Sequence, residues 1–209
     1  MNGRTKSSSP TWTRRTALVS SLAFAATPTF AQIVKPRVSM LTDKGAIVLE
    51  LEPAKAPLTS ANFLRYVDAR RFDGASFYRA SRDKENPSVG LIEGGLQNDP
   101  ARLFPPIAHE STTQTGLRHV NGTISMARYA PGTATADFFI CVGPAPYLDA
   151  DPNETGDNAG FAAFGQVVEG MDAVKVILAL PTNGFARNPV MRGQILSPPV
   201  AIITARRTG

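Results

Sequence analysis

Few residues in this chain could carry out covalent or metal-dependent chemistry. Its 209 residues include two histidines, His109 and His119, and one cysteine, Cys141. A lone cysteine forms no disulfide within the chain, and these three residues do not make a cysteine-rich metal site. His109-Glu110 also lacks the second histidine that a zinc-protease helix carries four positions later. The sequence therefore predicts a site that uses no metal and no cofactor.

The sequence offers no strong nucleophile or phosphate-binding motif. Ser125 lacks the glycine that follows the serine of a nucleophile elbow by two positions. Cys141 lies within the apolar run 138–142, which is typical of a buried and unreactive thiol. Gly94-Gly95 is not followed by the lysine and threonine of a phosphate loop. We expect neither hydrolysis through a covalent intermediate nor nucleotide binding.

Arg79 is the remaining candidate, in a segment rich in aromatic and aliphatic residues. A guanidinium is charged at every relevant pH and presents several N–H groups in a rigid fork. It can stabilise an electron pair that develops during a reaction. It can equally be a structural arginine that pairs with Glu93 or Asp137 at the rim of the fold. The residue alone leaves both interpretations open.

The elements that must position Arg79 are mostly strands. Alternation of apolar and polar residues predicts a hairpin at 37–42 and 46–52, turning at Asp43-Lys44-Gly45. Helical spacing of apolar residues predicts helices at 57–67 and 171–180. Further strands are expected at 76–80, 91–93, 123–128, 138–142, 164–168 and 200–206. Two helices cannot supply the crossovers of a parallel sheet, so we expect a mainly β fold: a closed eight-stranded antiparallel barrel capped by two α-helices.

The first 31 residues have the pattern of a secretory signal peptide. Arg4, Lys6, Arg14 and Arg15 precede an apolar stretch at 17–26, and small residues lead to Ala31. The apolar stretch is too short to span a bilayer, and Arg14-Arg15 is typical of twin-arginine export. The alternative is a disordered basic tail. We expect cleavage after Ala31, a domain over 32–209, export to the periplasm, and no membrane contact after cleavage.

The net charge of +5 does not indicate nucleic-acid binding, because the excess of basic residues lies in residues 1–31. Two polar segments, 82–88 and 149–160, are expected to be surface insertions. In the second, Asp149, Asp151 and Asn153 have the spacing of the first ligands of a calcium-binding loop. However, Glu154 and Gly160 stand where that loop needs a glycine and a bidentate glutamate. We therefore expect a solvated loop.

The ordered motifs resemble the cyclophilin-type peptidyl-prolyl cis-trans isomerases over about residues 35–206. They are the hairpin 44–51, the helix start 56–64, the stretch Phe72-Asp73-Gly74 to Arg79, Glu93-Gly94-Gly95, 122–127, 138–140 and 164–171. The resemblance implies the barrel described above, with prolines of other proteins bound on its outer face. An X-Pro bond isomerises by rotation about C–N, against a barrier of about 18 to 20 kcal/mol, so no bond has to break.

The resemblance implies that Arg79 is the catalytic residue, because it would donate to the prolyl nitrogen as the amide twists. Phe139 and Leu148 match the apolar wall of the proline pocket, and Met126 and Ala127 match the neighbouring strand. The full set of expected substrate-binding residues is Tyr78, Leu91, Glu93, Met126, Ala127, Arg128, Asp137, Phe139, Tyr147, Leu148 and Phe161.

Several of these positions depart from the best-known members of the family. Glu93 and Asp137 each replace a glutamine, Arg128 an asparagine, Phe161 and Tyr78 a histidine, and Tyr147 a tryptophan or phenylalanine. We expect Glu93 to orient Arg79 through a charge-assisted bond, and Arg128 to balance Asp137 across the groove. We expect Tyr147 to weaken cyclosporin binding.

Two functions follow. The first is an isomerase that accelerates proline-limited folding of exported polypeptides, and the second is a catalytically weak proline-segment binding module or holdase chaperone. The partners are proline-containing unfolded or folding chains in both cases. No coiled coil or exposed apolar stripe is apparent, so a monomer is expected.

Overall fold

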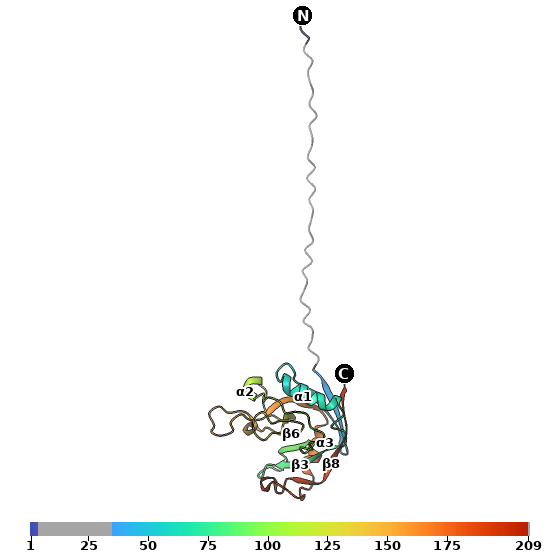
Figure 1. The fold of residues 1–209 in the computed structure, drawn as a ribbon, viewed down its shortest axis with the longest axis vertical. Helices are drawn as coiled ribbons and strands as arrows, with labels where there is room; N and C mark the ends of the chain where they lie inside the picture. Colours follow the sequence, from blue (N-terminus) through green and yellow to red (C-terminus); the bar gives the residue numbers. More distant parts are fainter. Residues whose placement is uncertain (4–34, 209) are drawn as a thin grey trace. The chain divides into compact units, whose positions relative to one another are not determined.

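The computed structural model describes residues 1–3 and 35–208, and residues 35–208 contain the predicted barrel (Figure 1). The predicted signal peptide, apart from its first three residues, lies outside the described part of the chain. Among the helices that the structure describes, none is long and apolar enough to span a membrane.

The helices and strands follow the predicted order. The strands are β1 (Arg37–Thr42), β2 (Gly45–Leu51), β3 (Ala75–Arg82), β4 (Gly90–Gly95), β5 (Thr123–Met126), β6 (Phe138–Val142), β7 (Ala162–Glu169) and β8 (Ile195–Thr208). The helices are α1 (Pro57–Asp68), α2 (Thr112–Thr115) and α3 (Met171–Ala179), with short 3₁₀ turns η1 (Pro146–Leu148) and η2 (Pro189–Met191).

The eight strands close into a barrel in the order β1-β2-β7-β5-β6-β4-β3-β8. Every pairing between neighbouring strands is antiparallel, which confirms the predicted fold class. Helix α1 packs against β7 and β8, while α3 packs against β2, β3 and β4. The two helices lie apart in Figure 1, with α1 at the upper side of the barrel and α3 lower, beside β8.

Three details differ from the sequence-based prediction. A third helix, α2, forms a single turn after Ser111, whose backbone N–H donates to the side chain of Gln114. This turn is too short for hydrophobic periodicity to reveal it. Strand β8 begins at Ile195 rather than at 200, and β5 ends at Met126, so Ala127 and Arg128 lie beyond the strand. Helix and strand ends are set by tertiary hydrogen bonds that local patterns do not encode.

The main core fills the inside of the barrel and the space beneath α1. Phe63 of α1 lies 5.1 to 5.4 Å, between ring centroids, from Phe72, Phe138 and Phe164. These four rings are fully buried. Because side chains alternate along a strand, the residues between the core positions of β4 and β6 point to the outer surface. That outer surface carries the candidate site.

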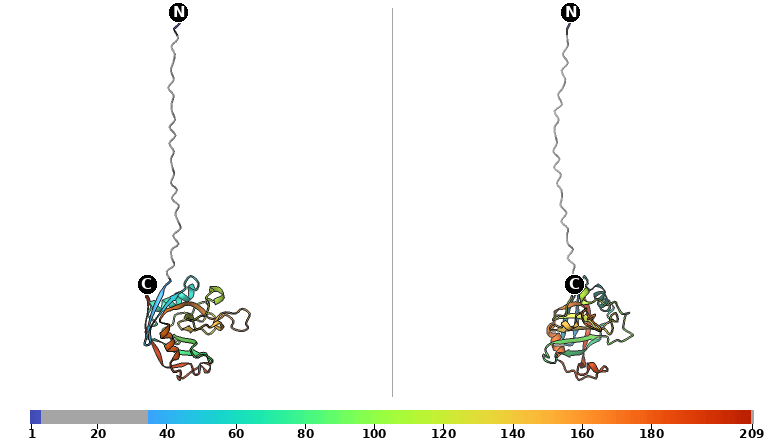
Figure 2. Two further views of the ribbon diagram at one scale, coloured as in Figure 1. Left: turned by 180° about the vertical axis from the view of Figure 1, so that it is seen from behind. Right: turned by 90° about the vertical axis from the view of Figure 1, so that its left-hand side faces the viewer.

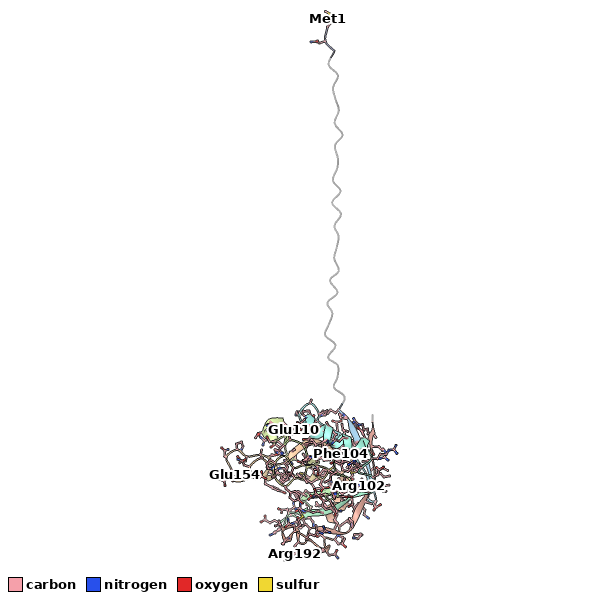
Figure 3. The ribbon with its side chains drawn as sticks, viewed as in Figure 1. Met1, Arg102, Phe104, Glu110, Glu154 and Arg192 are labelled. Atoms are coloured by element: carbon pink, nitrogen blue, oxygen red, sulfur yellow. The ribbon has the colours of Figure 1, made fainter. Side chains whose placement is uncertain are left out.

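The predicted insertions are surface loops. The first follows β3 and runs over residues 83–89, where the carboxylate of Asp83 accepts from the backbone N–H groups of Glu85 and Asn86. The second lies between η1 and β7 and contains Glu154, which projects to one side of the barrel in Figure 3.

Candidate functional site

A bulge in β3 places Arg79 on the outside of the barrel. Phe77 pairs with Gly94 and Arg79 pairs with Glu93, so Tyr78 is an extra residue between two consecutive pairs. Phe77 points into the core and is fully buried, whereas the Arg79 side chain is 20% exposed. The bulge therefore directs Tyr78 and Arg79 towards the same partner, Glu93.

Glu93 fixes both of these side chains. One carboxylate oxygen, Oε2, accepts from Nη1 of Arg79 at 2.6 Å, and the other, Oε1, accepts from the hydroxyl of Tyr78 at 2.8 Å. Burial, followed by the nearby charge of Glu93, raises the pKa of Tyr78, so its hydroxyl remains a donor at neutral pH. The geometry confirms the prediction that Glu93 orients Arg79 through a charge-assisted hydrogen bond.

A third partner of Arg79 was not predicted from the sequence. The Nε–H of Arg79 donates to Oε1 of Gln194 at 2.8 Å, although the two residues are 115 positions apart. Gln194 lies just before β8 in a segment rich in glycine and proline, where no pattern distinguishes one polar residue from another. No signal within the sequence could have identified it.

An apolar cluster lies beside Arg79 on the outer surface; we call it the outer cluster. Its buried members are Leu91, Phe139, Cys141, Ala145 and Leu148, with Ala127 and Phe161 packed against them. Glu93 of β4 pairs with both Arg79 of β3 and Phe139 of β6, so the three residues form one row across neighbouring strands. The structure thus places Arg79 on the same face of the sheet as the outer cluster, with Glu93 on the strand between Arg79 and Phe139.

Phe139 is held from both sides. The ring of Phe161 meets it edge-on at 5.4 Å, and the ring of His119 stacks on it at 5.8 Å between centroids. His119 is bonded in turn to Asp149 through Nδ1 at 2.7 Å and to Ser125 through Nε2 at 2.9 Å. Burial lowers the pKa of His119, which favours the neutral ring.

The arrangement Asp149–His119–Ser125 has the residue types of a hydrolase triad, but it is not accessible to a substrate. His119 and Ser125 are 1% and 0% exposed. The network lies behind Phe139, and its hydrogen bonds fix the ring that backs the outer cluster. It therefore supports the apolar wall.

One predicted substrate-binding residue is wrongly placed. Met126 is 1% exposed and belongs to the core inside the barrel, where it pairs with Phe138. Its neighbour Ser125 pairs with Phe139 on the outer side. Because successive side chains in a strand point to opposite faces, Met126 cannot line the outer surface together with Phe139.

The predicted balance between Asp137 and Arg128 is also wrong. Oδ1 of Asp137 accepts from the backbone N–H groups of Leu96 at 2.6 Å and Gln97 at 2.9 Å. Asp137 is 6% exposed, and burial raises its pKa to about 6, although these N–H bonds act in the opposite direction. Backbone donors, rather than an arginine, stabilise this carboxylate.

Arg128 instead ties the second insertion to the barrel. Its guanidinium forms a two-point salt bridge with Asp157, at 2.6 and 2.9 Å, and donates to the carbonyl oxygen of Gly160. It also lies over the ring of Phe161 at 5.0 Å. With its side chain only 3% exposed, Arg128 supports Phe161 from behind.

Tyr147 lies at the exposed end of the site. It is 74% exposed and borders a depression of about 250 Å³ whose lining includes Asp83, Val89 and Pro144. Ala145 belongs both to this lining and to the outer cluster. The first insertion thus extends the surface beyond the outer cluster. The described residues contain no group of three or more metal-ligating side chains.

Comparisons with known proteins agree with this geometry. The model of the family described as cyclophilin type peptidyl-prolyl cis-trans isomerase matches residues 37–200. A peptidyl-prolyl cis-trans isomerase of Acinetobacter baylyi is 32% identical over 170 residues, covering 81% of this chain and 84% of the relative. Peptidyl-prolyl cis-trans isomerase A of Dickeya dadantii is 34% identical over 171 residues, covering 80% and 84%.

A solved structure shares the fold at low sequence identity. A cyclophilin type peptidyl-prolyl cis-trans isomerase of Cryptosporidium parvum, determined in the presence of the dipeptide Ala-Pro, has a TM-score of 0.64 and 18% identity. The match covers 83% of this chain and 99% of that one. The barrel, the matching family model and the curated relatives agree: this chain belongs to the cyclophilin-type peptidyl-prolyl cis-trans isomerases.

Proposed function

We propose that Arg79 is the catalytic residue of this isomerase and that the outer cluster binds the proline ring. The observation that carries the proposal is the position of Arg79 at the edge of an apolar surface, oriented by Glu93. Its Nη2 has no hydrogen-bond partner in residues 35–208 and is not buried. Two N–H groups therefore hold the guanidinium while Nη2 stays available to a substrate.

This geometry suits the chemistry of amide rotation. When an X-Pro bond twists, resonance is lost and the prolyl nitrogen becomes pyramidal and more basic. A fixed cationic donor stabilises that nitrogen more than the nitrogen of the planar amide, which is what a rate enhancement requires. An apolar wall at Phe139 and Leu148 also disfavours the charge-separated resonance form of the planar state.

The energy supplied by one donor is limited. A 10⁵-fold enhancement needs about 7 kcal/mol. A hydrogen bond from a charged group contributes about 1.5 to 3 kcal/mol. The remainder has to come from binding the peptide in a twisted conformation and from removing water around it.

The test is the Arg79→Ala variant in an NMR exchange assay with a proline tetrapeptide. We expect the cis-trans exchange rate to fall about 10- to 150-fold, while the peptide still binds the outer cluster. Arg37→Ala is the matched control, because Arg37 also pairs with a glutamate, Glu50, directly across a hairpin. Its loss should leave exchange unchanged.

The same assay separates the isomerase from a proline-binding module or holdase. Peptide binding by the wild type without exchange between cis and trans peaks would support a binding module. Exchange by Arg79→Ala at the wild-type rate would remove Arg79 from the mechanism.

We further propose that the clients are exported polypeptides and that residues 1–31 are a cleaved signal peptide. The basic residues followed by a short apolar stretch and Ala31 support this proposal. N-terminal sequencing of the protein recovered from the periplasm of an expressing bacterium should begin at Gln32. Replacing Arg14 and Arg15 by lysine should block export of this protein if it uses the twin-arginine route. Export of the variant should continue if the protein uses the general secretory route.

A further inference from the structure

Arg79 is held at two points that differ in charge. Its Nη1 donates to the carboxylate of Glu93 and its Nε donates to the neutral amide of Gln194. The first bond sets the distance between guanidinium and carboxylate. The second restricts rotation about the Cδ–Nε bond, because Nε–H can reach Gln194 only when the guanidinium plane has one orientation.

The amide of Gln194 is itself oriented by its own segment. Its Nε2 donates to the carbonyl oxygen of Val190 at 3.2 Å, so Oε1 is the end that faces Arg79. Its backbone N–H donates to Met191 at 3.0 Å, and its carbonyl oxygen accepts from Ala80 at 2.8 Å. Gln194 is therefore fixed next to β3 through both its backbone and its side chain.

The segment between α3 and β8 is attached to β3 at its other end as well. The guanidinium of Arg82 donates to the carbonyl oxygens of Leu178 and Leu180 and to the hydroxyl of Thr182. In both views of Figure 2 this segment lies at the bottom of the barrel next to β3, and Figure 3 marks Arg192 at the same lower edge. Residues 181–194 thus form a support that runs along the strand carrying Arg79.

We propose that Gln194 is a positioning residue that orients the Arg79 guanidinium for catalysis without placing a second negative charge beside it. This inference rests on the proposed role of Arg79. A carboxylate at position 194 could accept the same bond, but with Glu93 it would place two negative charges on one cation. A neutral oxygen supplies orientation alone, and among the residues that the structure describes Glu93 remains the only carboxylate paired with Arg79.

The test is the Gln194→Met variant of the full chain, which keeps the length of the side chain and removes the acceptor. We expect kcat for a proline tetrapeptide to fall about tenfold and its Kd to change less than twofold, because the bond acts on the twisted state. The resonance of the Arg79 Nε–H should lose its protection from solvent exchange. The backbone N–H of Ala80 should remain protected, which reports that the segment is still folded.

Gln166→Met is the matched control, since Gln166 lies on β7 and its amide donates to the carbonyl oxygen of Asn121. It should leave kcat and the Arg79 resonance unchanged. Gln194→Glu restores the acceptor and should restore protection of the Nε–H. Its kcat should lie between those of Gln194→Met and the wild type, because of the added charge.

Three results would overturn the inference. They are a wild-type kcat in Gln194→Met, an equal loss in Gln166→Met, or no recovery of the Nε–H signal in Gln194→Glu. Arg79→Ala separates this inference from the proposed function. If Arg79→Ala loses activity while Gln194→Met keeps it, only the role of Gln194 is wrong. If both variants match the wild type, the role of Arg79 fails.

Discussion

Asp137 should make this protein less stable as the pH rises from about 4 to about 6. Its buried carboxyl has a pKa of about 6, against an ordinary value of 3.8, because burial disfavours the charged form. The folded protein therefore holds a proton on Asp137 in a range where the unfolded chain has released it. Stability falls across that range and then stays reduced at higher pH.

Asparagine at this position removes the penalty and keeps the structural contact. Oδ1 of Asp137 accepts from the backbone N–H groups of Leu96 and Gln97, and the amide oxygen of asparagine can accept the same two bonds. A rise in pKa from 3.8 to about 6 corresponds to about 3 kcal/mol. We expect Asp137→Asn to be more stable than the wild type by about that amount at pH 8, and equal to it at pH 4.

Urea unfolding followed by circular dichroism at pH 4, 5, 6, 7 and 8 measures this difference directly. Asp151→Asn is the control, because Asp151 is exposed and its Oδ1 also accepts a backbone N–H, from Asn153. The control should show no difference that grows between pH 4 and pH 6. A variant Asp137→Asn that is less stable than the wild type at pH 8, or that differs equally at every pH, would refute the reasoning.

Three other perturbations test separate parts of the structure. Glu110→Ala should lower the free energy of unfolding by about 3 kcal/mol, because the buried carboxylate accepts from the N–H groups of Leu58 and Thr59 at the start of α1. A loss below about 1 kcal/mol in urea unfolding would contradict this. Burial raises the pKa of Cys141 to about 12, so this thiol should not react with a thiol reagent at pH 8 until the protein is unfolded. Fast reaction of the native protein would show that the outer cluster is open. Tyr147→Trp should tighten cyclosporin binding in calorimetry, and an unchanged Kd would show that the exposed ring at this position does not set the affinity.

The sequence determined the eight strands and the two longer helices, α1 and α3. Alternating residues in β1 and β2 and helical spacing in α1 and α3 are local signals, since they depend on side chains a few positions apart. The helix predicted at 57–67 is found at Pro57–Asp68, and the strand predicted at 138–142 is found at those residues. The order of motifs also identified the family, and with it the pairing of Arg79 with Glu93.

The tertiary structure decided which side chains meet. Local patterns did not show that Met126 points inside the barrel while Ser125 points outside, because a register between strands sets the face that each residue occupies. They did not show that backbone N–H groups, rather than Arg128, stabilise Asp137, or that Gln194 reaches Arg79. Such contacts join residues from distant parts of the chain, and their geometry depends on the bulge in β3 and on the course of long loops. Both are properties of the closed barrel, and no short stretch of sequence contains them.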